Sequence, residues 1–147
     1  RPYPHVTTLN LDTGEASRGN LLPRPTTESY DFPQVRGSLL GRKARFGYCA
    51  GLGSNHNPNA VVKFDLQVTG TRRIWVIVGR IDLGDSVGGE ALFIPSKPNV
   101  DVFAGEGEED DGYLATFVTH QDGSNSGKPI DGRYPRDVVC IVQLPDR

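Results

Sequence analysis

Short apolar runs, closed by Gly, Pro, Asn or Asp, dominate this sequence, and none extends into the longer periodic pattern of an amphipathic helix. They are rich in β-branched and aromatic residues, which favour strands. The runs cover residues 5–11, 45–50, 60–66, 74–78, 91–94, 113–118 and 138–144. The pattern predicts an antiparallel all-β protein: a sandwich, a barrel or a set of propeller blades. Periodicity alone does not choose among these three.

Two of the expected turns have similar chemistry. Asp12-Thr13-Gly14 follows the first run, and Thr69-Gly70 separates the run 60–66 from the run 74–78. Turns of this kind join adjacent antiparallel strands, so we expect a hairpin at each position. The outer hairpins of propeller blades use such turns, but two copies do not establish a repeat.

The charge pattern argues against nucleic acid as a partner. The 147 residues carry a formal net charge of −2, and the basic groups at 42–45 and 72–73 lie beside strand-like runs. Such groups are typical of solvated strand edges, whereas nucleic-acid binding normally needs a clustered basic excess. No apolar run approaches the roughly 20 residues of a membrane-spanning helix. The absence of Met predicts that the chain is a piece of a longer protein.

The histidines do not form a recognisable metal motif. His5, His56 and His120 are far apart in the sequence, and none has a second ligand at metal-binding spacing. We therefore expect surface or structural histidines. The acidic run 106–111 lacks the alternating oxygen ligands of an EF-hand and predicts a solvated, self-repelling loop.

The two cysteines, Cys49 and Cys140, lie inside apolar runs, which predicts buried reduced thiols and a reducing compartment. Neither has a sequence-local base, and no G-x-S-x-G nucleophile motif is present. Motif chemistry alone therefore assigns no active site.

Four segments, read together, are more informative. They are SYDFPQV (29–35), GRKARFGY (41–48), GGEALFIP (88–95), and EEDDGYL (108–114) continuing to VQLP (142–145). In order and approximate spacing they resemble the C-terminal part of the carotenoid cleavage oxygenase family of non-haem iron enzymes. The combination of GGEALFIP with EEDDGYL is the specific part. The resemblance covers residues 9–147.

The resemblance implies an all-β fold: antiparallel blades forming the C-terminal part of a seven-bladed β-propeller. Residues 1–147 would be a partial propeller domain, truncated at both ends. In that family, Fe(II) lies on the axis and is held by four histidines. All four ligands are expected outside this chain, the last one just beyond Arg147. The segment is therefore expected to contain no catalytic or metal-ligating residue, to bind no iron by itself and to be inactive alone.

Two carboxylates match positions that, in the family, hydrogen-bond the iron-bound histidines. Glu90 in GGEALFIP matches the last such glutamate, and we expect it to be partly buried without an ion-pair partner. Asp31 stands where the family has Glu. Its side chain is one methylene shorter, which predicts a longer or weaker hydrogen bond to its histidine.

The implied activity is that of a dioxygenase that cleaves a conjugated C=C bond of a carotenoid or apocarotenoid with O₂ to give carbonyl products. Its partners would be that substrate and O₂, with any membrane association arising from segments not present here. One alternative is a stilbene-type phenylpropene-cleaving dioxygenase of the same superfamily. Another is a non-catalytic β-rich binding module. The expected location is intracellular: a plastid in a plant or alga, and otherwise the cytoplasm.

Overall fold

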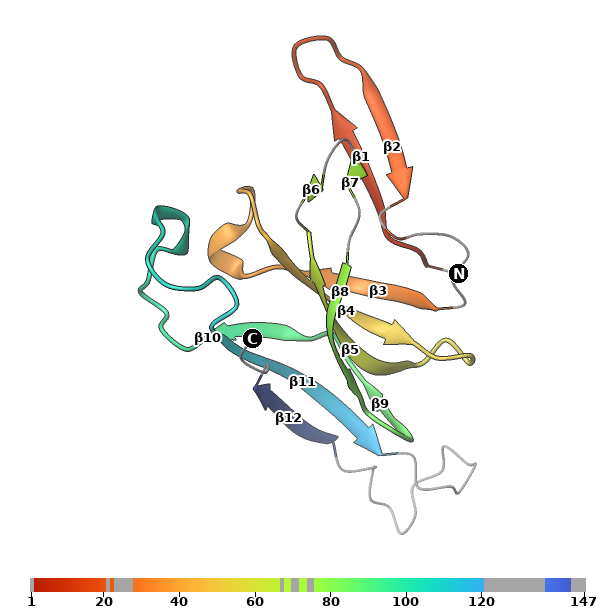
Figure 1. Ribbon diagram of the computed structural model, residues 1–147. Helices are drawn as coiled ribbons and strands as arrows, with labels where there is room; N and C mark the ends of the chain where they lie inside the picture. The colour runs from red at the N-terminus through yellow and green to blue at the C-terminus, as the bar shows by residue number, and fades with distance from the viewer. Residues whose placement is uncertain are drawn as a thin grey trace.

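The computed structural model describes residues 2–20, 22, 28–66, 68–69, 72–73, 76–120 and 137–143. Within these residues the chain forms twelve strands and two short 3-10 helices, and no α-helix (Figure 1). The strands are β1 (His5–Leu9), β2 (Ala16–Asn20), β3 (Ser29–Gln34), β4 (Phe46–Leu52), β5 (Pro58–Asp65), β6 (Val68–Thr69), β7 (Arg72–Arg73), β8 (Val76–Asp82), β9 (Ser86–Gly88), β10 (Leu92–Pro95), β11 (Gly112–His120) and β12 (Asp137–Gln143). The 3-10 helices are η1 (Gly37–Leu39) and η2 (Val102–Ala104). The antiparallel all-β expectation is confirmed.

Two four-stranded antiparallel sheets form the body of the protein. The first has the order β3-β4-β5-β8, and the second has the order β10-β11-β12 with β9 also paired to β11. Two smaller hairpins, β1-β2 and β6-β7, accompany them. The β1-β2 hairpin projects away from the body in Figure 1. Among the described residues, no helix has the length and apolar character needed to cross a bilayer.

The expected hairpins form where the turn residues predicted them. Gly14, with φ of +74°, lies in the turn between β1 and β2. Strand β5 pairs with β8, and β6-β7 extends that hairpin outward. Gly70 itself lies outside the described residues.

Several strands have too little apolar periodicity to be predicted. β2 is polar and exposed, and it forms because β1 supplies its hydrogen-bond partners. β3 contains Pro33, a residue that lacks a backbone donor. It lies at the edge of the first sheet, where a proline is tolerated.

The core lies on both faces of the first sheet, which explains the nearly continuous burial of β4 and β5. Between the two sheets, Tyr48 and Phe93 stack at 5.3 Å between ring centroids. The complete cluster there comprises Phe46, Tyr48, Val61, Ala91, Phe93 and Leu114. A second buried cluster comprises Leu22, Tyr30, Cys49, Ala60, Val62 and Phe64. The two sheets therefore pack face to face, and the first sheet has a buried cluster on each of its faces.

The second sheet has one buried and one exposed face among the described residues. Phe93 and Leu114 point into the core, whereas Leu92 and Ile94 on β10 and Phe117 on β11 are exposed. Alternation along a strand places successive side chains on opposite faces. The exposed apolar side chains therefore share the outer face.

Candidate functional site

Glu90 lies in a break between two short strands. β9 ends at Gly88, opposite Val118, and β10 begins at Leu92, opposite Ala115. Three residues on this side therefore stand opposite two on β11, which is the arrangement of a β-bulge. A bulge bends a strand and re-aims the side chain that it carries.

The backbone just before Glu90 is fixed to the neighbouring strand. The Gly89 N–H donates to the carbonyl of Phe117 at 2.8 Å. The buried Thr116 hydroxyl donates to the Gly89 carbonyl at 3.1 Å. The direction in which Glu90 leaves the strand is thus set by two contacts with β11.

A second bulge lies in β3, directly after Asp31. Asp31 pairs with Ala50 and Gln34 with Tyr48, so two residues of β3 stand opposite one of β4. Phe32, inside the bulge, has φ of +53°, a conformation uncommon for a residue with a side chain. The Asp31 carboxylate accepts a hydrogen bond from the Phe32 N–H at 2.8 Å, which supports this conformation.

A side-chain hydrogen bond joins the two bulges. The Gln34 amide Nε2 donates to Oε1 of Glu90, across 56 positions of the sequence and between the two sheets. The structure therefore brings Glu90 to the strand that carries Asp31, through a residue that sequence reasoning had not singled out.

The expected burial of Glu90 is wrong. Its side chain is exposed, because the bulge turns it away from the core. Within the described part of the chain Glu90 has no ion pair, and Gln34 is its hydrogen-bond donor. Asp31 is half-buried. Asp31 and Glu90 thus remain candidate acceptors for donors outside the described residues.

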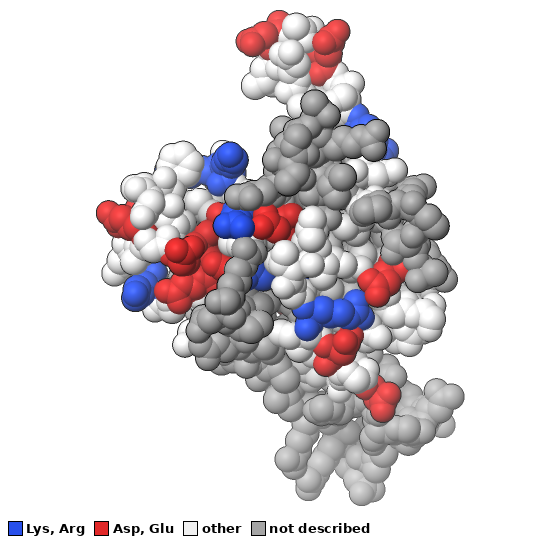
Figure 2. Space-filling view, in the orientation of Figure 1, with Lys and Arg blue, Asp and Glu red and all other residues white. Residues whose placement is uncertain are grey.

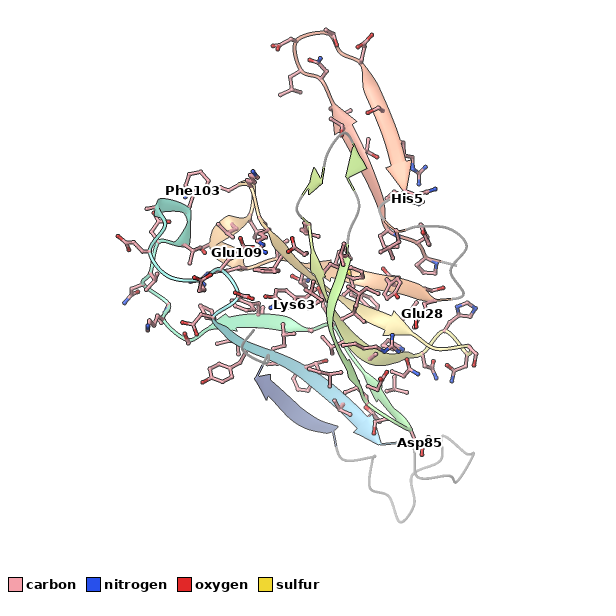
Figure 3. All side chains as sticks on the ribbon, viewed as in Figure 1. His5, Glu28, Lys63, Asp85, Phe103 and Glu109 are labelled. Carbon is pink, nitrogen blue, oxygen red and sulfur yellow. The ribbon has the colours of Figure 1, made fainter. Side chains whose placement is uncertain are left out.

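The three histidines do not gather. His5 begins β1 and lies away from Lys63 and Glu109 in Figure 3, and its ring lies 6.1 Å from that of Tyr3 between centroids. His56 is exposed in the loop between β4 and β5. His120 ends β11, and its side chain lies outside the described residues. The described part of the chain contains no group of three His, Cys, Asp or Glu residues that could hold a metal ion.

The acidic run 106–111 is not simply a solvated loop, as its composition had predicted. Both oxygens of the Glu109 carboxylate accept a hydrogen bond from the backbone N–H of Arg45 at 2.9 Å, and Oε1 also accepts from that of Phe46 at 2.8 Å. Asp110 pairs with the ammonium of Lys63 at 2.5 Å. Figure 2 shows acidic and basic atoms side by side where this segment lies, and Figure 3 shows Lys63 close to Glu109. The run therefore fastens the second sheet to the first.

Arg36 also binds the acidic run. Its guanidinium is buried and donates to the carbonyls of Glu108 and Glu109, at 3.5 and 3.3 Å, and to the Ser38 hydroxyl at 3.2 Å. Sequence reasoning missed both Arg36 and Lys63. The signal for Lys63 is its place inside an apolar strand, because a buried ammonium needs a carboxylate partner.

Cys49 is buried and reduced, as predicted. Burial, with a smaller contribution from the negative charge of Asp31, raises the pKa of its thiol to about 12. The Tyr48 hydroxyl is also buried, with no hydrogen-bond partner among the described residues, and burial raises its pKa. Neither group is ionised near neutral pH, so neither acts as a nucleophile there. The side chain of Cys140 lies outside the described residues.

Antiparallel four-stranded sheets that pack face to face place the described residues in the all-β class. The chain matches part of a β-propeller enzyme, the cobalt-substituted apocarotenoid oxygenase of Synechocystis, with a TM-score of 0.63 at 18% identity. The match covers 97% of this chain and 25% of that one.

The sequence profile of the retinal pigment epithelial membrane protein family matches residues 1–147. The chain therefore belongs to this family, that of the carotenoid cleavage oxygenases, as its four motif segments had indicated.

The chain is also similar to two plant dioxygenases. The chain is 37% identical, over 151 residues, to the carotenoid 9,10(9′,10′)-cleavage dioxygenase 1 of Phaseolus vulgaris, and the match covers 95% of this chain and 26% of that protein. It is 34% identical, over 142 residues, to the chloroplastic 9-cis-epoxycarotenoid dioxygenase NCED2 of Oryza sativa subsp. japonica, with 95% and 23% covered. The chain spans about a quarter of the length of these relatives.

Proposed function

We propose that this chain is part of a non-haem Fe(II) dioxygenase that uses O₂ to cleave a conjugated C=C bond of a carotenoid or apocarotenoid, giving carbonyl products. The observation that carries the proposal is the 37% identity, over 95% of the chain, to a carotenoid cleavage dioxygenase. In this proposal the two four-stranded sheets are C-terminal blades of a seven-bladed propeller, and the activity belongs to the longer protein.

In this proposal the described residues have a supporting role at the iron site, and the iron ligands come from elsewhere in the longer protein. They contain no cluster of metal-binding side chains. Glu90, however, is an exposed carboxylate without an ion pair in the described part of the chain, and one of its oxygens is already oriented by a neutral amide. A carboxylate in this state can accept the N–H of an imidazole and hold that ring in one tautomer and orientation.

Asp31 has the same role in the proposal, toward a different histidine. Its Oδ1 accepts a hydrogen bond from the Phe32 N–H, which fixes the carboxylate beside the β3 bulge. The iron, held by histidines from the rest of the protein, would supply the redox chemistry that O₂ requires. The contribution of this segment is to orient ligands through Glu90 and Asp31.

The proposed location is drawn from the same relatives. The name of the rice relative places that protein in the chloroplast. For this chain we propose an intracellular location, in a plastid if the source is a plant or alga.

The test uses the full-length protein that contains this segment. Purified with iron, it should convert a carotenoid or apocarotenoid to shorter carbonyl products, detected by chromatography and mass spectrometry. Glu90→Gln should reduce iron affinity or turnover by about 10–100-fold while the fold persists. Glu106→Gln is the matched control, because Glu106 is exposed and, within the described part of the chain, its side chain accepts a hydrogen bond only from the Asp101 N–H, at 3.3 Å.

Two results would count against the proposal. Full iron occupancy and turnover in Glu90→Gln would show that Glu90 is not part of the iron site. One tightly held iron per chain in the isolated 147 residues, measured by elemental analysis after dialysis, would contradict the expectation that the ligands lie elsewhere.

A further inference from the structure

Gln34 and Glu90 meet although each belongs to a different sheet, and the backbone on both sides of the contact is fixed. Gln34 ends β3 in register with Tyr48, directly after the β3 bulge. Glu90 follows Gly89, whose N–H is bonded to the carbonyl of Phe117. The side-chain torsions therefore decide where the Glu90 carboxylate points. An exposed glutamate otherwise samples many rotamers, and ordering it costs conformational entropy.

The donor at this contact is a neutral amide, which matters chemically. A Lys or Arg in the same place would pair with the carboxylate charge and compete with any further donor. An amide restricts the geometry of the carboxylate and leaves its negative charge in place. The Gln34 amide engages Oε1 of Glu90, so with respect to the described residues Oε2 retains its lone pairs for a second donor.

Asp31 and Gln34 flank the same bulge in β3. Strand β3 thus carries the Asp31 carboxylate, and its Gln34 amide orients the carboxylate of Glu90. We propose that Gln34 is a positioning residue that sets the orientation of the Glu90 carboxylate toward an imidazole of the iron site. Gln34 itself contacts neither metal nor substrate. This inference rests on the proposed function.

The experiment replaces the iron of the full-length protein with Co²⁺, since a related oxygenase has been obtained in cobalt-substituted form. The visible d–d absorption of Co²⁺ reports ligand geometry, and the rate of metal loss to a chelator reports how firmly the ligands are held. Gln34→Met retains a similar side-chain length but removes the donor. We expect a changed d–d spectrum and metal loss faster by about 3–10-fold, a smaller effect than that of a direct histidine partner.

Two further variants separate positioning from simple packing. Gln34→Ser keeps a polar surface but is too short to reach Glu90, so it should reproduce the effect of Gln34→Met. Val35→Ala disturbs packing at the half-buried neighbouring position and keeps the donor, so it should lower Tm and leave the cobalt spectrum unchanged. If Val35→Ala changes the spectrum as much as Gln34→Met does, the role of Gln34 is structural and the proposal is overturned.

Glu90→Gln, measured in the same way, separates a failure of the role assigned to Gln34 from a failure of the proposed function. A changed spectrum in Glu90→Gln with an unchanged one in Gln34→Met overturns the role of Gln34 and leaves the proposed function intact. Unchanged spectra in both variants overturn the placement of Glu90 at the metal site as well. If Gln34 acts through Glu90, the double variant should resemble Glu90→Gln alone, whereas additive effects would contradict the proposal.

Discussion

Both carboxylate oxygens of Glu109 lie 2.9 Å from the backbone nitrogen of Arg45, 64 positions earlier in the chain. Arg45 directly precedes β4, and Glu109 lies in the segment that leads into β11. A carboxylate that accepts from backbone N–H groups makes stronger hydrogen bonds than a neutral acceptor does. This contact therefore ties the start of a central strand of the first sheet to the segment that enters the second.

Replacing Glu109 should destabilise the protein measurably. Glu109→Ala leaves the backbone donors of Arg45 and Phe46 without their acceptor, which should cost about 1–3 kcal/mol of unfolding free energy. Urea denaturation of the full-length protein provides the measurement. Glu108→Ala is the control: its side chain is exposed, so its effect should stay within about 0.5 kcal/mol. Equal losses in both variants would contradict the role assigned to Glu109.

Breaking the pair between Asp110 and Lys63 should be costly. The Lys63 side chain is only 6% exposed, and its ammonium also lies over the Phe46 ring, 4.5 Å from the centroid. Asp110→Asn leaves this buried charge without its counter-charge, and we expect a loss of about 3 kcal/mol in the same denaturation assay. Asp82→Asn removes the 65% exposed partner of Arg80 and should cost less than about 1 kcal/mol. A larger loss of unfolding free energy in Asp82→Asn than in Asp110→Asn would refute this account.

Gly112 has no room for a side chain. A Cβ at this position would lie 2.4 Å from the carbonyl oxygen of Ile94 and 3.0 Å from Cα of Pro95, both on the paired strand β10. Backbone cannot yield without breaking the pairing, so Gly112→Ala should cost about 1–3 kcal/mol, read as a fall in Tm. Gly37→Ala meets nothing within 4 Å and should leave Tm nearly unchanged. A neutral Gly112→Ala would mean that β10 and β11 are not held this closely.

The buried thiol of Cys49 should make stability fall at alkaline pH. In the folded protein its pKa is raised to about 12 from the ordinary 9.0, so the thiol stays protonated while that of the unfolded chain ionises. The stabilisation is therefore complete below pH 9 and is lost as the pH rises toward 12. Tyr30 and Tyr48 also have raised pKa values, so the contribution of Cys49 is the difference between the wild-type protein and Cys49→Ala.

Alkylation provides a direct check on the same thiol. In the full-length protein at pH 8, iodoacetamide should modify Cys49, located by peptide mass spectrometry, only after urea unfolds the protein. Rapid modification of the folded protein would show that the thiol is accessible.

Local pattern was sufficient for most of the strands. The apolar runs at 60–66 and 113–118 correspond to β5 and β11, and the run at 74–78 overlaps β8. Trp75, inside that last run, lies outside the described residues. β3 and β9 could not be predicted in this way, because their residues follow hydrogen-bond partners on another strand more than their own periodicity.

In the candidate site, too, local sequence identified some residues and not others. Asp31 and Glu90 were found from motif segments, because those motifs are contiguous in the sequence. Gln34 was not, since its partner lies 56 positions away. The two bulges were not predictable either, because a bulge is a mismatch in length between two paired strands and exists only once their register is set.

The sequence by itself determined the antiparallel all-β class, the main hairpins and the family, since turn chemistry, strand periodicity and contiguous motifs are local properties. Only the tertiary structure decided which charges are buried. Glu109 and Asp110 read as solvated carboxylates in an acidic run, yet they accept backbone N–H groups and pair with Lys63 from the other sheet. Glu90 was expected to be partly buried, yet its bulge exposes it beside Gln34. Burial and pairing depend on groups that folding brings together from distant positions, and no local pattern contains them.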